Sequence, residues 1–291
     1  MSIIEIKDLS FYYGDQMGIE GLTLNIEKGE IFGFLGENGA GKTTTIRCMM
    51  SILVNQVGEI VIDGKKVMRS DLSYKEEIGY LPGELYIPDN YRVKDFLQYM
   101  MTLHKKPSTR VDELVQRFDI PTHKRIKQLS KGNKQKLGIA LALMHDPKVL
   151  ILDEPSSGLD PLLQQELYTL LLEEKEKGKT IFFSSHNLDE VQRICDRVAI
   201  IRKGVLVTIE DVKDLSKDVT RKLKAKVTNI KEDLLKGFDY SVDKENSEVT
   251  VMVPGGSSLS SIMEVLKEMD LLDLDYPPAS LETYFLDKYR G

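Results

Sequence analysis

Residues 36–43, GENGAGKT, combine glycine, lysine and threonine at a spacing that suits the binding of phosphate groups. They follow EIFGFL, an apolar run typical of a buried strand, and they open a segment with the helical spacing of apolar residues. Glycines let successive main-chain amides wrap phosphate oxygens, and the following helix directs its positive end at them. The sequence therefore predicts a nucleotide-phosphate loop made of Gly36, Glu37, Asn38, Gly39, Ala40, Gly41, Lys42, Thr43 and Thr44.

Three side chains of this loop are expected to act on a bound nucleotide. Lys42 should reach the β- and γ-phosphates, Thr43 should ligate Mg²⁺, and Thr44 should bond the α-phosphate. The alternative is a glycine-rich turn that carries a surface lysine. The flanking strand and helix favour the phosphate loop, because the motif requires both.

A second apolar run, VLILDEP, ends in the carboxylates Asp153 and Glu154. Ligands of open α/β sheets gather at the carboxyl ends of buried strands. Asp153 is therefore predicted to hold Mg²⁺, and Glu154 to polarise the water that attacks the γ-phosphate. The alternative is an acidic pair that merely caps the following turn.

The stretch LSKGNKQKLGIALAL, residues 129–143, predicts a helix that begins after Ser130. Gly132 permits close approach of another group to this second anion-binding helix end. The stretch resembles the signature segment of ATP-binding cassette (ABC) nucleotide-binding subunits. A capped amphipathic helix is the alternative, which its position upstream of VLILDEP disfavours.

This resemblance implies further roles. In the family the signature serves ATP held by the other subunit, so Ser130 and Gly132 would complete the site of a second copy in a head-to-tail dimer. SSGLDP resembles the D-loop, with Asp160 as its acidic member, and His186 in FFSSHN resembles the switch histidine that contacts the γ-phosphate. The other three histidines are interpreted as structural.

The stretch FYYGDQ resembles the family's aromatic loop, which stacks on adenine. Tyr13 is the better candidate for this contact, and Tyr12 is the alternative. A tyrosine that faces the core remains open as a third reading.

The sequence departs from the family's pattern in two places. Where a glutamine usually follows a proline, IGYLPGELY has Gly83 and then Glu84, and Glu84 is the candidate substitute as a metal ligand. The signature has Lys131 and Asn133 where glycine and glutamine are common, within a basic run that begins HKRIKQ. This run is either a solvated face or a surface that attracts nucleotide.

Strands alternate with helices as far as about residue 210, which predicts an α/β fold. We expect a P-loop NTPase mixed sheet with a helical subdomain, in a nucleotide-binding domain of residues 1–215 with the subdomain at about 84–145. The remaining segment predicts a small accessory α+β domain, residues 220–291, that ends in a helix over SLETYFLDKYR.

Composition limits the class of protein. A net charge of −6 argues against a nucleic-acid scaffold, so no nucleic-acid partner is expected. No stretch approaches 18 uncharged apolar residues, and the two cysteines lack metal-ligand spacing, which indicates a soluble protein of a reducing cytosol. Any membrane role would come through a partner.

The resemblance and these limits favour an ATP-binding and hydrolysing subunit of an ABC transporter, with ATP and Mg²⁺ as cofactors. The end of the chain resembles ATPase subunits of bacterial exporters of drugs, peptide antibiotics or polymers. Such a subunit would lie in the cytoplasm, on the inner face of the membrane, bound to a separate permease that it drives by dimer closure. A soluble ABC ATPase acting on DNA or ribosomes and a P-loop kinase are the alternatives.

Overall fold

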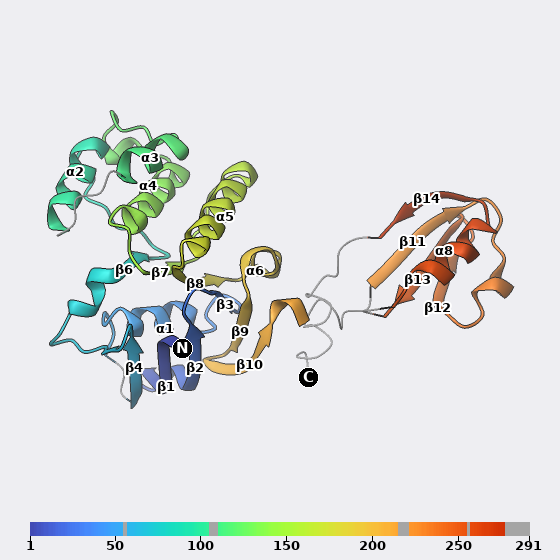
Figure 1. Ribbon diagram of the computed structural model, residues 1–291, viewed down its shortest axis with the longest axis horizontal. Helices are drawn as coiled ribbons and strands as arrows, with labels where there is room; N and C mark the ends of the chain where they lie inside the picture. Colours follow the sequence, from blue (N-terminus) through green and yellow to red (C-terminus); the bar gives the residue numbers. More distant parts are fainter. Residues whose placement is uncertain (55–56, 105–109, 215–220, 255–256, 277–291) are drawn as a thin grey trace. The chain divides into compact units, whose positions relative to one another are not determined.

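The computed structural model describes residues 1–54, 57–104, 110–214, 221–254 and 257–276. The chain divides into two compact units, Met1–Glu210 and Asp211–Gly291 (Figure 1). None of the described helices is both long and apolar enough to span a membrane. The helix expected over SLETYFLDKYR lies outside the described residues.

A six-stranded sheet forms the centre of the first unit, in the order β10-β9-β3-β8-β7-β6. Its inner strands are apolar and buried on both faces, as a parallel sheet between helices requires. Lys203 and Gly204, both with positive φ, turn the chain back from β9 into β10, so the sheet is mixed. The strands are β3 (Ile31–Leu35), β6 (Ile78–Leu81), β7 (Val149–Asp153), β8 (Thr180–Ser185), β9 (Arg197–Arg202) and β10 (Val205–Asp211).

An antiparallel sheet of order β2-β1-β4-β5 packs its apolar residues into the same core. Alternation along β1 and β2 buries Ile4 and Ile6 against Leu24 and Ile26, which is the half-buried pattern expected of such strands. The strands are β1 (Ser2–Tyr13), β2 (Gln16–Glu27), β4 (Val57–Ile62) and β5 (Lys65–Lys66).

The helices of the first unit lie around the central sheet and in a helical part beside it (Figure 1). The helical part comprises α2 (Val93–Leu103), α3 (Arg110–Arg117) and α4 (Lys131–Leu143), and the other helices are α1 (Lys42–Met49), α5 (Pro161–Glu176) and α6 (Leu188–Ile194). Gly79 of β6 admits α4 closely, since a Cβ atom there would lie 2.0 Å from the carbonyl oxygen of Ala142.

Ion pairs fasten the helical part to α5. Arg117 donates to both carboxylate oxygens of Glu173, at 2.5 and 2.9 Å, and Arg110 pairs with the fully buried Glu174. The rings of His104 and His145 stack with their centroids 4.1 Å apart. Burial lowers the pKa of His145 to about 4, so this pair carries no mutual charge repulsion at neutral pH.

Within its described residues, the second unit contains an antiparallel sheet of order β12-β13-β11-β14, and the helix α8 packs against it. The chain passes from β13 through α8 to β14, and both strands pair with β11 between them, which is a split βαβ arrangement. Val251 and Leu266 lie in its core. The elements are β11 (Arg221–Val227), β12 (Asp239–Asp243), β13 (Glu248–Val253), α8 (Ser260–Lys267) and β14 (Leu271–Asp275).

Candidate nucleotide site

The loop between β3 and α1 needs glycine at two positions for different reasons. A Cβ atom on Gly36 would lie 2.5 Å from the carbonyl oxygen of Ile201, so the neighbouring strand excludes any side chain. Gly41, at the start of α1, has φ of 108°, a region that residues with a side chain rarely adopt. These two glycines let the loop fold back over the end of the sheet.

The main chain of this loop offers donors. Within the described part of the chain, the amides of Gly41, Lys42 and Thr43 find no hydrogen-bond acceptor, while the amide of Thr45 begins the helical ladder by donating to Gly41. Free amides at a helix N-terminus are the donors that bind phosphate oxygens. The loop therefore fits the phosphates of a nucleotide.

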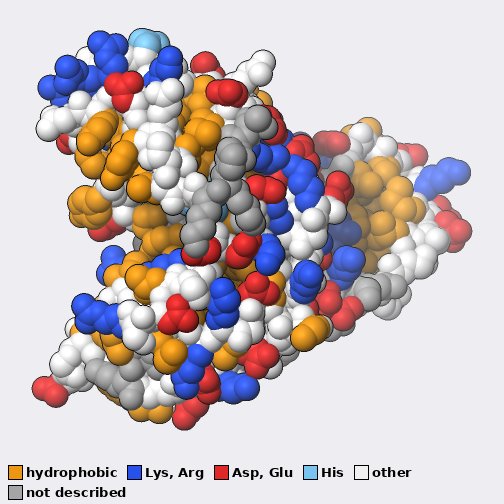
Figure 2. Space-filling model, turned by 60° about the vertical axis from the view of Figure 1, so that its left-hand side comes forward, with side chains coloured by type: hydrophobic (Ala, Val, Ile, Leu, Met, Phe, Trp, Pro, Cys, Tyr) orange, Lys and Arg blue, Asp and Glu red, His pale blue; other side chains and the backbone are white. Residues whose placement is uncertain are grey.

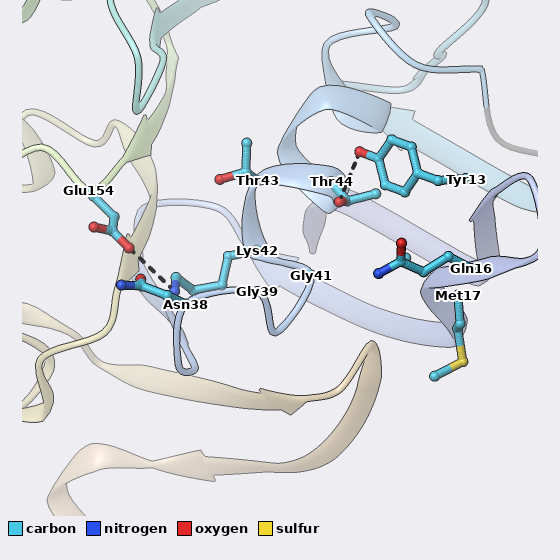
Figure 3. A pocket seen from close by; sticks show the side chains of 11 residues that line it. Tyr13, Gln16, Met17, Asn38, Gly39, Gly41, Lys42, Thr43, Thr44 and Glu154 are labelled. Carbon is cyan, nitrogen blue, oxygen red and sulfur yellow. Dashed lines mark hydrogen bonds and ion pairs between the residues drawn. The ribbon is translucent and has the colours of Figure 1, made fainter.

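Lys42 lies at the centre of the site, with 5% of its surface exposed. Its Nζ donates to the carbonyl oxygens of Gly36 at 2.7 Å and Glu37 at 3.2 Å, and lies 3.3 Å from Oε1 of Glu154 (Figure 3). These contacts hold the buried ammonium group of Lys42 beside the free amides of the loop. Together they would compensate the negative charge of a bound triphosphate.

A cavity of about 390 Å³ adjoins this loop. Its lining includes Tyr13, whose hydroxyl lies 3.3 Å from Oγ1 of Thr44 on the side away from Glu154 (Figure 3). Phe11 meets the Tyr13 ring edge-on, at 4.9 Å between centroids. The hydroxyl of Tyr12 instead donates to Glu20, at 2.8 Å. Of the two tyrosines considered for adenine, Tyr13 is thus the one at the cavity.

Asp153 receives hydrogen bonds from two directions. Thr43 Oγ1 donates to its Oδ2 at 2.8 Å, and Ser184 Oγ donates to its Oδ1 at 2.6 Å. Among the described residues, no group of three or more His, Cys, Asp or Glu side chains lies together as a metal cluster. Thr43 and Asp153 nevertheless suit Mg²⁺, which commonly binds one carboxylate together with substrate phosphates.

Glu154 lies between a cation and an imidazole. Its Oε1 faces Lys42, and its Oε2 lies 3.1 Å from Nδ1 of His186. Its φ of 48° is unusual for a long side chain and marks local strain, which tends to cluster at active sites. The amide of Glu154 donates to the Ser184 hydroxyl at 3.1 Å, and that contact helps to hold this conformation.

Ser184 is a positioning residue that the sequence analysis did not identify. It is fully buried on β8, directly opposite Asp153 in the parallel register of β7 and β8. One hydroxyl thereby orients the side chain of Asp153 and the main chain of Glu154. A polar residue in the apolar run TIFFSS was the available signal.

Removing this hydroxyl tests its role. We expect Ser184→Ala to lower kcat for ATP hydrolysis about tenfold or more with a smaller change in KM, since Asp153 loses a buried donor. Ser184→Thr, which keeps the hydroxyl, should restore most of the rate, and Thr169→Ala, which removes an exposed hydroxyl of α5, serves as the control. Equal melting temperatures would exclude unfolding as the cause, whereas an unchanged kcat would contradict the assignment.

The signature segment begins α4 as expected. Ser130 caps the helix by accepting from the amide of Asn133 at 3.3 Å. Gly132 lies against the D-loop of the same chain, because a Cβ atom there would be 2.9 Å from the carbonyl oxygen of Gly158. Gln135 Nε2 donates to the carbonyl oxygen of Pro155 at 2.9 Å, which ties α4 to the end of β7.

Several predicted site residues do not line the cavity, among them Glu84, Asp153 and His186. Ser130, Gly132 and Asp160 are also not among the described residues that line it. Asp160 caps α5, accepting from the amide of Leu163 at 3.0 Å.

Gly83 and Glu84, which replace the family's usual glutamine after proline, differ in their position relative to Asp153. A Cβ atom on Gly83 would lie 3.1 Å from Oδ2 of Asp153, so the position next to the carboxylate is held by glycine. The side chain of Glu84 is exposed. Its role as a metal ligand stays a prediction.

Comparison with known proteins decides the family. Residues 19–157 match the family model described as "ABC transporter". The chain is 32% identical to the bacitracin transport ATP-binding protein BcrA of Bacillus licheniformis, over 100% of this chain and 98% of BcrA. The chain belongs to the ABC transporter family. The ABC transporter ATP-binding protein YtrB of Bacillus subtilis is 29% identical over 99% of both chains.

Solved ABC structures share the fold. An ATP-binding subunit of an ABC transporter, 29% identical, superposes with a TM-score of 0.68 over 74% of this chain and 92% of its own. The cbiO1 protein of Clostridium perfringens, described as part of the complex cbiONQ, is 30% identical, with a TM-score of 0.62 over 74% and 90% of the two chains. The α/β fold expected from sequence is confirmed, and this ABC protein is an ATP-binding ATPase subunit of a transporter.

Proposed function

We propose that this chain drives an exporter, as two copies that close head to tail around ATP and act on a separate permease. The convergence of Lys42, Glu154 and His186 beside the phosphate loop carries the proposal. Similarity to BcrA along the whole chain supports export, since BcrA is named for bacitracin transport. In this arrangement the protein is cytoplasmic and lies on the inner face of the membrane.

The site supplies a base, an orienting group and a fixed cation. Glu154 accepts the proton of the attacking water, while His186 holds its second carboxylate oxygen. Lys42 and the free loop amides compensate charge on the phosphates. When bound, Mg²⁺ would neutralise further phosphate charge, with Thr43 and Asp153 as its ligands and Glu84 as a further candidate.

The second copy supplies the opposite side of each site. Ser130 and Gly132 lie at a helix N-terminus outside the cavity of their own chain, which is what a role toward another copy requires. In this proposal, Asp160 also lies in the contact between the two copies. ATP that binds the closed dimer more tightly than the open one would shift the population toward closure, and hydrolysis would reverse this shift.

The helical part is proposed to receive a cytoplasmic segment of the permease. Figure 2 shows a hollow in the first unit, with hydrophobic side chains on both sides of it. Large exposed apolar residues occur both in the helical part and elsewhere in the first unit, and where such residues gather on one face they mark a surface for a partner. They include Ile52, Leu72, Tyr86 and Leu103, and Tyr86 is 89% exposed.

Co-purification tests this proposal. We expect the tagged chain to co-purify, in detergent, with the membrane protein encoded beside it. Tyr86→Asp should abolish this association while the isolated subunit keeps its ATP turnover, because Tyr86 makes no part of the nucleotide cavity. Met263→Asp, an exposed position of the second unit, is the control. A wild-type chain that never associates with a membrane protein would contradict the transport assignment.

A further inference from the structure

The basic run that begins HKRIKQ lies beside a second basic segment. Main-chain hydrogen bonds join the two, from Val93 to Lys124 and from Ile126 to Tyr91, both at 3.0 Å. Val93 and Ile126 are fully buried, while the basic residues on either side of them are exposed. We call this the basic surface, and it consists of Arg92, Lys94, Lys124, Arg125 and Lys127.

Arg92 and Arg125 stand directly opposite each other in an isolated antiparallel bridge. Like charges in such a pair destabilise it, so the arrangement costs free energy unless an anion compensates. Among the described residues, the guanidinium groups donate only to the carbonyl oxygens of His123 and Asn90 respectively, each at 3.4 Å. The fold therefore maintains a concentration of positive charge.

No carboxylate within the described part of the chain forms an ion pair with the basic surface. The exposed Asp95 lies next to Lys94 in sequence but pairs with none of the five residues. The later part of the run differs, since Lys134 lies 3.3 Å from Asp89 and the stem of Lys131 lies against Gly158. The basic run thus has two parts. Lys131 and Lys134 contact residues of the same chain, whereas the residues of the basic surface are available to a partner.

Two tyrosines adjoin the basic surface. The rings of Tyr91 and Tyr99 stack with centroids 6.4 Å apart, and the residues are 45% and 50% exposed. Figure 2 shows Lys and Arg side chains gathered at the upper end of the first unit, above hydrophobic side chains. Exposed tyrosine beside unpaired lysine and arginine is the composition of protein surfaces at a membrane interface.

We propose that the basic surface rests on the anionic phospholipid headgroups that surround the permease. This inference depends on the proposed function, which brings the chain to a membrane. An anionic bilayer repels a chain of net charge −6 unless a basic surface faces it, so this surface would also orient the subunit. Neutral bilayers offer no such attraction.

Flotation of the full-length chain with vesicles tests the proposal. Vesicles of phosphatidylcholine with phosphatidylglycerol should bind the chain at low salt, and phosphatidylcholine vesicles should not. The variant Arg92→Gln/Lys124→Gln/Arg125→Gln should bind the anionic vesicles at least about tenfold more weakly. The matched control is Lys222→Gln/Lys224→Gln/Lys226→Gln, which removes three exposed lysines of β11 and should leave binding unchanged.

Equal binding by the two triple variants, or no preference for anionic vesicles, would overturn the proposal. Displacement of the chain from vesicles by inorganic phosphate, ATP or RNA, at matched ionic strength, would also overturn it, since the surface would then serve a free phosphate or a nucleic acid. The triple variant should still co-purify with the membrane protein in detergent. Failure of the wild type in that assay would count against the proposed function and not against lipid binding.

Discussion

Glu154→Gln should lower ATP turnover by at least about a hundredfold while nucleotide binding persists. Glutamine has the size of glutamate, so it can keep a contact with Lys42, but it cannot accept the proton of the attacking water. The loop amides and Lys42, which carry the binding, are unaltered. Loss of the carboxylate charge also leaves His186 without its anionic partner, which adds to the defect.

The same variant should accumulate as an ATP-dependent dimer, because the closed state would no longer be released by hydrolysis. Size-exclusion chromatography with and without ATP, alongside a phosphate-release assay, measures both effects. Glu176→Gln, an exposed position on α5, is the control and should behave as the wild type. If Glu154→Gln hydrolyses ATP at the normal rate, Glu154 is not the base.

Sequence predicted the parts of this site that lie within contiguous motifs. The glycine loop, the strand that carries Asp153 and the helix capped by Ser130 can each be recognised from a stretch of fifteen residues or fewer. The role of Ser184 was not predicted, because it depends on the register between β7 and β8. These two strands are separated in sequence by the whole of α5. A single sequence does not reveal which residues of two buried parallel strands face each other.

Tertiary context also explains β6 and β14, two strands whose own residues do not predict them. IGYL is only four residues long and contains Gly79, which weakens a strand in isolation. Its pairing with β7 and the close packing of α4 stabilise it. In LLDLD two aspartates oppose strand formation, yet pairing with β11 recruits the segment, with Asp273 opposite Lys226 and Asp275 opposite Lys224.

Ser130→Arg should abolish hydrolysis while nucleotide binding to the isolated subunit stays nearly intact. Arginine fills the helix end that would face the triphosphate of the second copy, but the cavity that holds the chain's own nucleotide does not include Ser130. Loss of the cap costs about 1 kcal/mol and does not by itself unfold α4. A large loss of nucleotide affinity in the monomer would contradict the cross-subunit role.

Ser130→Asp separates capping from anion binding. Aspartate caps a helix as well as serine does, so melting temperature should not fall, yet its charge repels a phosphate. We therefore expect this stable variant to lose hydrolysis and ATP-dependent dimerisation as Ser130→Arg does. Ser130→Thr, which keeps a neutral hydroxyl cap, should retain both. Activity in Ser130→Asp would show that the serine serves only as a cap.

Mixing two inactive variants decides whether each site is shared. A heterodimer of Ser130→Arg and Lys42→Ala has one site in which an unaltered phosphate loop faces an unaltered signature segment. A heterodimer has one intact site of two, so about a quarter of wild-type turnover should return if the chains pair at random, and about half if the two variants pair only with each other. Neither variant alone recovers activity when concentrated. If every site were built within one chain, both variants would lack a working site in any pairing, and the mixture would stay inactive.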